Sequence, residues 1–342
     1  MSTLAAIELA YWQSTAIKVA VVLGIIPAGA LLLGYVFLMK MMSHMQSRLG
    51  PMEAGPHGVL QLVADGVKFI QKEDIFPARA DRTVFALAPL VVLLSTFLLY
   101  VVIPAGPRLI VEDLDTGVFF ALAVSSLSVL GILMAGWASA NKYALMGGLR
   151  AAGQLIAYEL PLVLAVVGVV IQAETMSLQG IVVAQADGAI FGFGAVGNPF
   201  ILTQAVGFGI FLMAVQAELT QTPFDMPVAE SELVTGYMTE YTGFRFLFFF
   251  MAEFGTAFAF SAIAATLFLG GWYLPGVEGT LADALGPFVL GGKIMLVAFF
   301  IFWFRFTFPR FREDQLQQLA WKYLIPLSLI NILITGVLKV VM

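Results

Sequence analysis

The amino-acid sequence predicts an all-α, polytopic membrane protein with eight transmembrane helices and one interfacial amphipathic helix. Of its 342 residues, 60% are hydrophobic and 11% are charged, whereas about 25% of residues are charged in an ordinary soluble protein. The mean hydropathy is +0.95. Crossing a hydrocarbon core of about 30 Å takes roughly 20 apolar residues, and the chain contains eight runs of about that length. We therefore expect a single integral membrane domain over 1–342.

The eight expected spans are joined by short segments, except for one long loop after the first span. The spans are expected at about 16–39, 83–105, 116–137, 152–173, 199–217, 244–272, 287–308 and 322–341. Inside the long loop, the glycines and prolines of 50–58 disfavour regular helix.

Residues 59–72 follow this glycine- and proline-rich stretch and are strongly amphipathic at helical spacing. Gln61, Asp65, Lys68 and Lys72 fall in one sector of the helical wheel, and apolar side chains fill the opposite side. Fourteen residues are too few to span the membrane. We expect this helix to lie along the cytoplasmic interface or to pack on another subunit.

Lysine and arginine are unevenly distributed between the connecting segments. Segments 40–82, 138–151, 218–245 and 305–322 hold 13 of the 17 basic residues. Because loops on the cytoplasmic side are enriched in Lys and Arg, these four are expected to be cytoplasmic loops of a plasma-membrane protein. Both termini then fall outside.

The composition excludes several kinds of site. A chain without cysteine has no thiolate ligand for zinc or an iron–sulfur cluster and forms no disulfide, and its two histidines leave little for a transition metal. We expect no metal site, and no basic stripe indicates nucleic-acid binding. Any redox centre must then belong to another protein.

The most informative feature is the segment 218–240, which lies between two expected spans and contains no basic residue. It carries the five carboxylates Glu218, Asp225, Glu230, Glu232 and Glu240. An acidic side chain at mid-membrane costs roughly 2.5–3.5 kcal/mol on insertion scales, so such groups usually serve a function. The cluster indicates proton handling, ion handling or binding of a polar ligand.

Two more carboxylates fall inside expected spans. Glu159 precedes Pro161, which removes a backbone donor and should free the carbonyl near Ala157; alternatively, Glu159 is stabilised at a helix N-terminus. Glu253 lies among phenylalanines, where desolvation favours the protonated form unless a partner is present. It could exchange protons near neutral pH, or remain a neutral acid hydrogen-bonded to a neighbouring helix.

Four ordered motifs together resemble one family, the H subunit of NADH–quinone oxidoreductase (respiratory complex I, mitochondrial subunit-1 type). The motifs are Arg48-Leu-Gly-Pro with Gly58-Val-Leu-Gln-Leu-Val-Ala-Asp65, Asn141-Lys-Tyr-Ala with Leu149-Arg150, Thr222-Pro-Phe-Asp-Met-Pro with Glu230 and Glu232, and Arg305 with Pro309-Arg310. The match covers nearly the whole chain.

The resemblance implies a membrane subunit that forms the wall of a quinone chamber and the start of an acidic proton path coupling quinone reduction to ion pumping. Quinone would enter between the first span, the sixth span and the amphipathic helix. Flavin and iron–sulfur clusters would belong to hydrophilic partner subunits, and small membrane subunits would lead to antiporter-like ones. This chain would bind no cofactor, with quinone as substrate, and would hold no complete active site alone.

Residue roles are implied by matching positions in the motifs. The quinone-chamber residues would be Arg48, Asp65, Lys68, Phe224 and Asp225. The proton path would comprise Glu159, Glu218, Glu230, Glu232, Glu240 and Glu253. Closely spaced carboxyls in a medium of low dielectric constant cannot all ionise, so they would share protons.

The sequence departs from the usual family pattern at several positions. Met52, Gln221, Val228 and Ser126 stand where the family usually has Asn, Arg, Glu and Glu, and another Glu is replaced around Leu38. Without the Arg, the acids of 218–240 are expected to depend on charge supplied by partner subunits.

Other functions remain open. A secondary transporter could bind a cation with these carboxylates, but such folds commonly contain inverted repeats, and none is seen. A nearer alternative is the membrane subunit of a translocase fed by deazaflavin or ferredoxin, or of an energy-converting hydrogenase. The Thr222-Pro-Phe-Asp and Gly50-Pro motifs favour the quinone branch.

Overall fold

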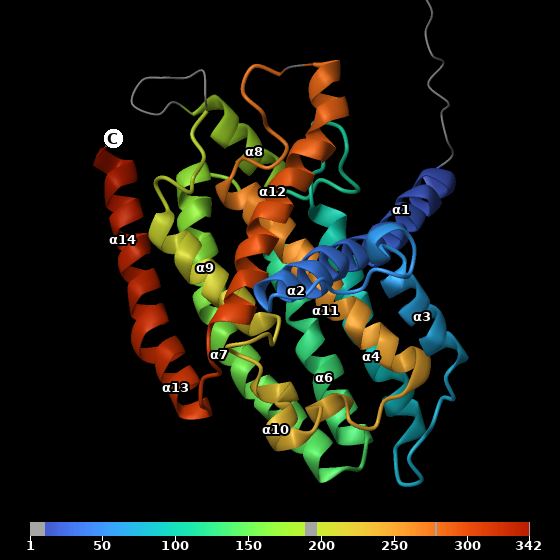
Figure 1. Cartoon of the computed structure of the whole chain (residues 1–342). Coiled ribbons are helices and arrows are strands. Elements are labelled where there is room, and N and C mark those ends of the chain that lie inside the picture. The colour runs from blue at the N-terminus through green and yellow to red at the C-terminus, as the bar shows by residue number, and fades with distance from the viewer. Residues whose placement is uncertain (1–10, 189–196, 278, 342) are drawn as a thin grey trace, which may run out of the picture.

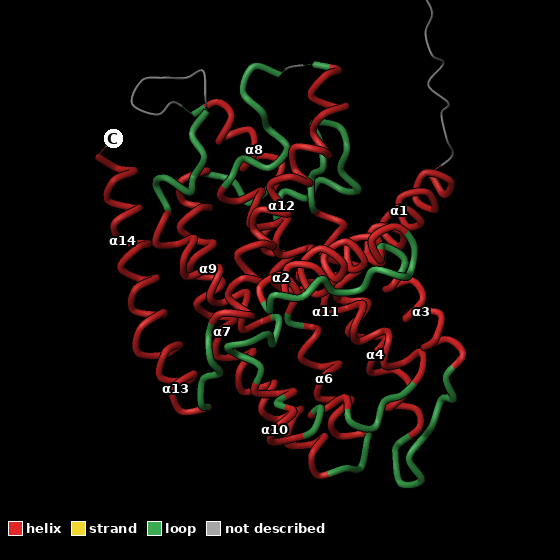
Figure 2. The backbone as a smooth tube through the Cα atoms, in the orientation of Figure 1, coloured by secondary structure: helices red, strands yellow, loops and turns green. Residues whose placement is uncertain are grey.

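The computed structural model describes residues 11–188, 197–277 and 279–341, and all regular structure in these ranges is helical. Most of the long helices pack side by side and are joined by loops at the two ends, whereas the first helical stretch runs obliquely across the others (Figures 1 and 2). The expectation of an all-α membrane protein is confirmed.

Seven helical stretches of the described chain are long and apolar enough to cross a membrane. They are Trp12–Met45, Arg82–Val102, Gly117–Ala138, Lys142–Ala173, Gly243–Phe268, Thr280–Thr307 and Glu313–Val341. The individual helices are α1 (Tyr11–Leu33), a π-helical segment (Gly34–Met41), α2 (Met42–Met45), α3 (Gln61–Gln71), α4 (Arg82–Leu99), α5 (Gly117–Ser125), α6 (Leu127–Ala138), α7 (Lys142–Ala173), α8 (Leu178–Asp187), α9 (Ala205–Glu218), α10 (Glu230–Leu233), α11 (Gly243–Phe268), α12 (Thr280–Thr307), α13 (Glu313–Gln318), a second π-helical segment (Leu319–Leu324) and α14 (Ile325–Val341). Short 3₁₀ turns lie at Pro56–Gly58, Tyr100–Val102, Met226–Val228 and Gly236–Met238.

The remaining apolar helix, α9, is shorter than the span expected at 199–217. It has 14 residues, which at 1.5 Å per residue gives about 21 Å, less than the hydrocarbon thickness. The chain before it is not helical. There the Phe200 N–H donates to Gln185 Oε1 (3.1 Å), and the Ile201 N–H donates to the Phe268 carbonyl (2.9 Å). Protein groups therefore satisfy backbone N–H groups that are not part of a helix here.

The prediction of a loop at 138–151 is wrong for most of these residues, because α7 begins at Lys142. Asn141 caps the helix, its Oδ1 accepting from the Tyr143 N–H at 2.8 Å. The glycines that suggested a loop serve close packing instead: a methyl group added at Gly147 would lie 2.6 Å from the Tyr237 nitrogen. Pro161 does not interrupt α7. A further helix, α8, was not expected between 174 and 198.

The third span is divided at Ser126 into α5 and α6. The Ser95 hydroxyl donates to the Val124 carbonyl at 3.0 Å, and the Ser125 hydroxyl donates to the Leu122 carbonyl at 2.8 Å. Side-chain hydroxyls thus take over carbonyls that would otherwise serve the helix.

Helix α11 lies at the centre of the packing, against α1, α4 and α12, while α7 packs against α6, α9 and α14. The C-terminal half of α11 is almost entirely buried, whereas α14 buries only Ser328 and Thr335. The short helices α10 and α13 lie at one end of the molecule, and α8 and the C-terminal end of α14 lie at the other (Figure 1).

Candidate functional site: an acidic loop, a small cavity and an open cleft

The acidic loop between α9 and α11 is a packed part of the fold. Phe224 is 3% exposed, and its ring centroid lies 5.2 Å from that of Tyr158 and 5.5 Å from that of Phe311. The Gln154 amide donates to the Phe224 and Ala217 carbonyls, each at 2.7 Å. The start of the loop is therefore fixed to α7.

A glycine permits the tight turn at the centre of this loop. Gly236 has φ of +57°, and a methyl group added there would lie 1.8 Å from the Pro227 carbonyl oxygen. Only glycine tolerates both the backbone angle and this close approach. The two 3₁₀ turns of the loop are consequently held against each other.

Asp225 forms a two-point ion pair with Arg310, which lies after α12. The Arg310 Nε donates to Asp225 Oδ1 at 2.6 Å, Nη2 donates to Oδ2 at 2.7 Å, and Nη1 donates to the Ser231 hydroxyl at 3.0 Å. The hydrogen bonds that Arg310 donates to Asp225 raise the pKa of Arg310. Arg310 is thus a permanent cation that joins the loop to the chain before α13.

The remaining loop carboxylates face the N-terminal end of α7 or solvent. Glu232 accepts from Arg150 Nη1 at 2.6 Å, and Glu240 accepts from Asn141 Nδ2 at 2.5 Å. Glu230 is exposed. The loop therefore has two acids tied to α7.

Two acids of the loop, and Glu253 of α11, contact cations of their own chain. Arg150 of α7, Arg305 of α12 and Arg310 after α12 contact Glu232, Glu253 and Asp225, respectively. All three arginines occur in the sequence motifs, but linear spacing does not reveal which carboxylate each will meet.

Glu218 and Glu253 line one small cavity of about 40 Å³. The other polar residues lining it are Ser95, Ser125, Ser128, Thr220, Tyr237 and Thr256. One water needs about 10–15 Å³, so the cavity has room for about three. Three spans, the shorter helix α9 and the loop after it thus bring two carboxyls and several hydroxyls to one hydratable space.

Glu253 has partners, which is one of the cases that the sequence left open. Its Oε1 accepts from Arg305 Nη1 at 3.3 Å and from Gln221 Nε2 at 3.4 Å. Glu218, in contrast, has no hydrogen bond or ion pair within the described ranges, and it lies within electrostatic range of Glu159. Glu159 is partly exposed on α7.

Tyr237 is a polar residue of this cavity that sequence reasoning missed. It is 7% exposed, and burial together with the charge of Glu253 raises the pKa of its hydroxyl. The hydroxyl therefore keeps its proton and can donate a hydrogen bond in the cavity. Tyr237 lies beside Gly236 in a turn, so the periodic spacing of a helix could not indicate which way its side chain would face.

A larger cleft of about 500 Å³ lies between the first π-helical segment, α3 and α11. It is lined by Leu38, Met39, Leu62, Asp65, Lys68, Phe69, Lys72, Phe246 and Phe250. The polar stripe of α3 thus borders this cleft, while its apolar residues Val63, Val67 and Ile70 are exposed. Asp65 accepts from Gln61 Nε2 at 3.0 Å and from Lys68 Nζ at 3.4 Å.

The residues expected around a quinone do not form one group. Asp65 and Lys68 line the cleft, whereas the exposed Arg48 donates to Gln46 Oε1 at 2.8 Å and does not line it. Phe224 and Asp225 belong to the packed loop and line neither the cleft nor the cavity.

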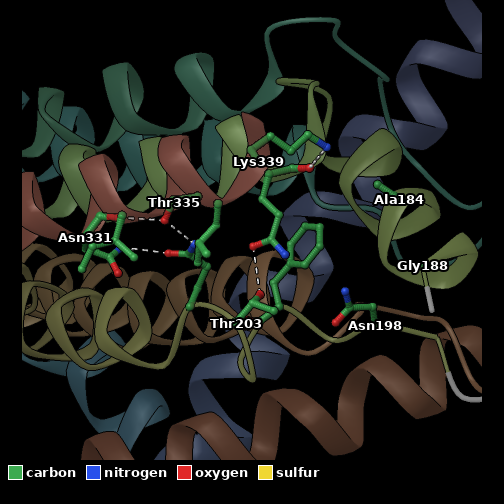
Figure 3. A pocket seen from close by; sticks show the side chains of 12 residues that line it. Ala184, Gly188, Asn198, Thr203, Asn331, Thr335 and Lys339 are labelled. Carbon is green, nitrogen blue, oxygen red and sulfur yellow. Dashed lines mark hydrogen bonds between the residues drawn. The ribbon is translucent and has the colours of Figure 1, made fainter. Parts of the chain in front are cut away.

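A third pocket, of about 400 Å³, lies near the opposite end, between α7, α8 and α14 (Figure 3). At its base, Gln204 Oε1 accepts from Asn331 Nδ2 at 2.8 Å, and Gln204 Nε2 donates to the Thr335 hydroxyl at 2.7 Å. This network holds α14 against the bundle. None of the expected site residues lines the pocket.

The described part of the chain contains no group of three or more His, Asp or Glu residues able to hold a metal ion.

Comparison with known proteins places these features in a family. Residues 17–336 match the sequence model of the family described as NADH dehydrogenase. The chain is 46% identical over 301 residues to the H subunit of NADH-quinone oxidoreductase from Geobacillus kaustophilus, covering 88% of this chain and 86% of that protein. It is 43% identical over 331 residues to the corresponding H subunit from Anoxybacillus flavithermus, covering 96% of both chains. The H subunit from Thermomicrobium roseum is 45% identical over 312 residues, or 89% of each.

Proposed function

The chain belongs to the NADH dehydrogenase family, and from this premise we propose that it is the H-type membrane subunit of a proton-translocating NADH–quinone oxidoreductase, respiratory complex I. In that assembly it contributes the membrane wall of the quinone chamber and the first part of the proton path. The names of its relatives favour NADH and quinone over the alternative of a ferredoxin- or deazaflavin-fed translocase or a hydrogenase.

The cleft between α3 and α11 supports a role in quinone binding. Its phenylalanine and leucine side chains suit an isoprenoid tail, and Asp65 and Lys68 at its edge can meet a polar headgroup. Phe224 and Asp225 would act deeper in the chamber, as part of the loop that partner subunits cover, with Arg48 at its cytoplasmic side.

The cavity shared by Glu218 and Glu253 is the observation that carries the coupling role. Water in this cavity would join the two carboxyls through the Tyr237 hydroxyl, and Glu159 would extend the path along α7. Glu230, Glu232 and Glu240 would form its cytoplasmic side. Because neighbouring carboxyls cannot all ionise, a change in charge on a nearby quinone redistributes their protons.

The electron carriers would belong to partners. A chain without cysteine has no thiolate for an iron–sulfur cluster, so we place the clusters and the flavin in hydrophilic subunits of the complex. Small membrane subunits would continue the proton path toward antiporter-like subunits.

The distribution of basic residues supports an orientation in the plasma membrane. The segments 40–82, 138–151, 218–245 and 305–322 would face the cytoplasm. Both termini would lie outside; residues 1–10 themselves are outside the described ranges.

The function is tested by Glu218→Gln and Glu253→Gln in assembled complexes. Both substitutions keep the side-chain size and remove a titratable group. NADH-driven quinone reduction, proton pumping or both should therefore fall by at least about tenfold, since a positioned proton-transferring side chain contributes on the order of 10²–10⁴-fold. Glu112→Gln is the matched control, because Glu112 is exposed and, among the residues that the structure describes, forms an ion pair only with Lys18, at 3.2 Å.

Wild-type turnover and pumping in both variants would refute the proton path. Membranes that reduce quinone with ferredoxin or deazaflavin, but not with NADH, would overturn the donor and leave the quinone role intact.

A further inference from the structure

The segment between α3 and α4 is fastened to the start of α11 by Arg245. Its Nη1 donates to Asp74 Oδ1 at 2.6 Å, and its guanidinium carbon lies 3.9 Å from the ring centroid of Phe76. The Arg245 side chain is only 19% exposed. A charged hydrogen bond and a cation–π contact therefore act together on a largely buried guanidinium, while Asp74 is 42% exposed.

Backbone contacts beside Arg245 strengthen this fastening. The Thr242 hydroxyl accepts from the Ile75 N–H at 3.1 Å and donates to the Glu73 carbonyl at 3.2 Å. Gly243, with φ of +58°, lets the chain pass close by, since a methyl group there would lie 3.1 Å from the Lys72 carbonyl oxygen. We call the contacts of Asp74 and Phe76 with Arg245 the latch.

The latch lies at one end of the cleft between α3 and α11. Phe246, next to Arg245, and Lys72, just before Asp74, both line the cleft. Phe246 also stacks on Phe69 of α3, with ring centroids 5.5 Å apart. At the other end of α3, a methyl group added at Gly34 would lie 2.8 Å from Leu62 Cδ1. Helix α3 is thus held at both ends, with the cleft between them.

Resting on the proposed function, we propose that Arg245 is a positioning residue that fixes the width of this cleft and thereby selects quinones by the length of their isoprenoid tail. Dispersion contacts weaken steeply when two surfaces separate by even half an ångström. A long tail lies against the cleft walls over most of its length and loses many contacts when α3 moves. A short tail makes few such contacts and loses little.

The test compares two quinones that share a headgroup, one with a single isoprene unit and one with a long isoprenoid tail, in membranes containing the assembled complex. Arg245→Ala should raise KM for the long-tailed quinone about 5-fold, the size of the net contribution of roughly one ordinary hydrogen bond. The kcat and the KM for the short-tailed quinone should stay near wild type. Asp74→Asn should act in the same direction, and Arg245→Ala with Asp74→Asn should add little.

Arg312→Ala is the matched control. It breaks an Arg–Asp pair with the same 2.6 Å contact, but that pair is exposed and lies away from the cleft. Should Arg245→Ala fail to assemble, Asp74→Asn and Arg245→Lys, which keep the side-chain bulk, give the same comparison.

Equal KM changes for both quinones, or none for either, would overturn the role of the latch. A wild-type complex that reduces neither quinone would instead overturn the proposed function.

Discussion

Single residues of the acidic loop depend on arginines that are distant in sequence. Asp225 and Arg310 are 18% and 28% exposed at their side chains, so each charge would be costly without the other. Gln221 shows the opposite situation. It is 2% exposed, and its Oε1 has no hydrogen-bond partner, although its amide nitrogen reaches Glu253.

The arrangement around Glu253 leads to a rescue prediction. Arg305→Gln removes the only cation that contacts Glu253 within the described ranges, and it should slow NADH-driven quinone reduction about 5-fold by leaving a carboxylate unpaired. Adding Gln221→Arg should restore most of the rate, because position 221 already lies against the same carboxylate. Rates are measured per amount of assembled complex.

Gln221→Arg alone serves as the control for crowding in the buried site. A double variant as slow as Arg305→Gln would contradict the assignment of Arg305 as the counter-charge of Glu253.

At the scale of elements, close backbone contacts decide how the loop docks. Gly147 of α7 and Gly236 of the loop allow the two backbones to approach within reach of a single methyl group. The glycines at 147 and 148 look like loop residues in the sequence, because glycine weakens isolated helices. Tertiary packing overrides this preference, and α7 starts five residues before Gly147.

Gly236→Ala should therefore disrupt the packing of the acidic loop against itself and α7. The new methyl group would meet the Pro227 carbonyl at 1.8 Å in a backbone conformation with φ of +57°, and we expect a loss of more than about 2 kcal/mol in the free energy of unfolding. The measurement is the thermal midpoint of the purified complex, together with its quinone reductase rate.

Gly209→Ala is the matched control, since nothing lies within 4 Å of the methyl group it adds to α9. Equal midpoints for the two variants would show that the contact at Gly236 is not structurally important.

At the scale of the whole molecule, the ends of the bundle differ in charge. The acidic loop, α10 and α13 share one end, and the third pocket with α8 lies toward the other (Figure 1). Charge counts in the sequence predict that the first end is cytoplasmic.

Single-cysteine labelling can test this orientation directly, because the chain has no cysteine of its own. A membrane-impermeant maleimide should label Asp115→Cys in intact cells and Arg79→Cys only in inverted vesicles. Both positions are exposed, and labelling after permeabilisation controls for cover by partner subunits. The reverse pattern would invert the topology.

The candidate site was only partly predictable from sequence. Glu218 and Glu253 could be identified from the sequence, because a carboxylate next to a long apolar run stands out there and is costly to place in a membrane. Their shared cavity, the hydroxyls around it and the Arg305 contact are formed by four different spans together with α9 and the loop after it. The sequence also did not predict that the polar face of α3 borders the cleft. Helical periodicity shows which residues share a face, but not which other helix that face will contact.

The sequence by itself determined the helical membrane fold, through composition and apolar run length, and the family, through ordered motifs. Only the tertiary structure decided where α7 and α9 begin, which arginine meets which carboxylate, and that Arg245 fastens α3 beside the cleft. The physical reason is that a span must satisfy its own backbone hydrogen bonds in lipid and so is encoded locally. Side-chain pairing, by contrast, depends on how helices distant in the chain are packed together.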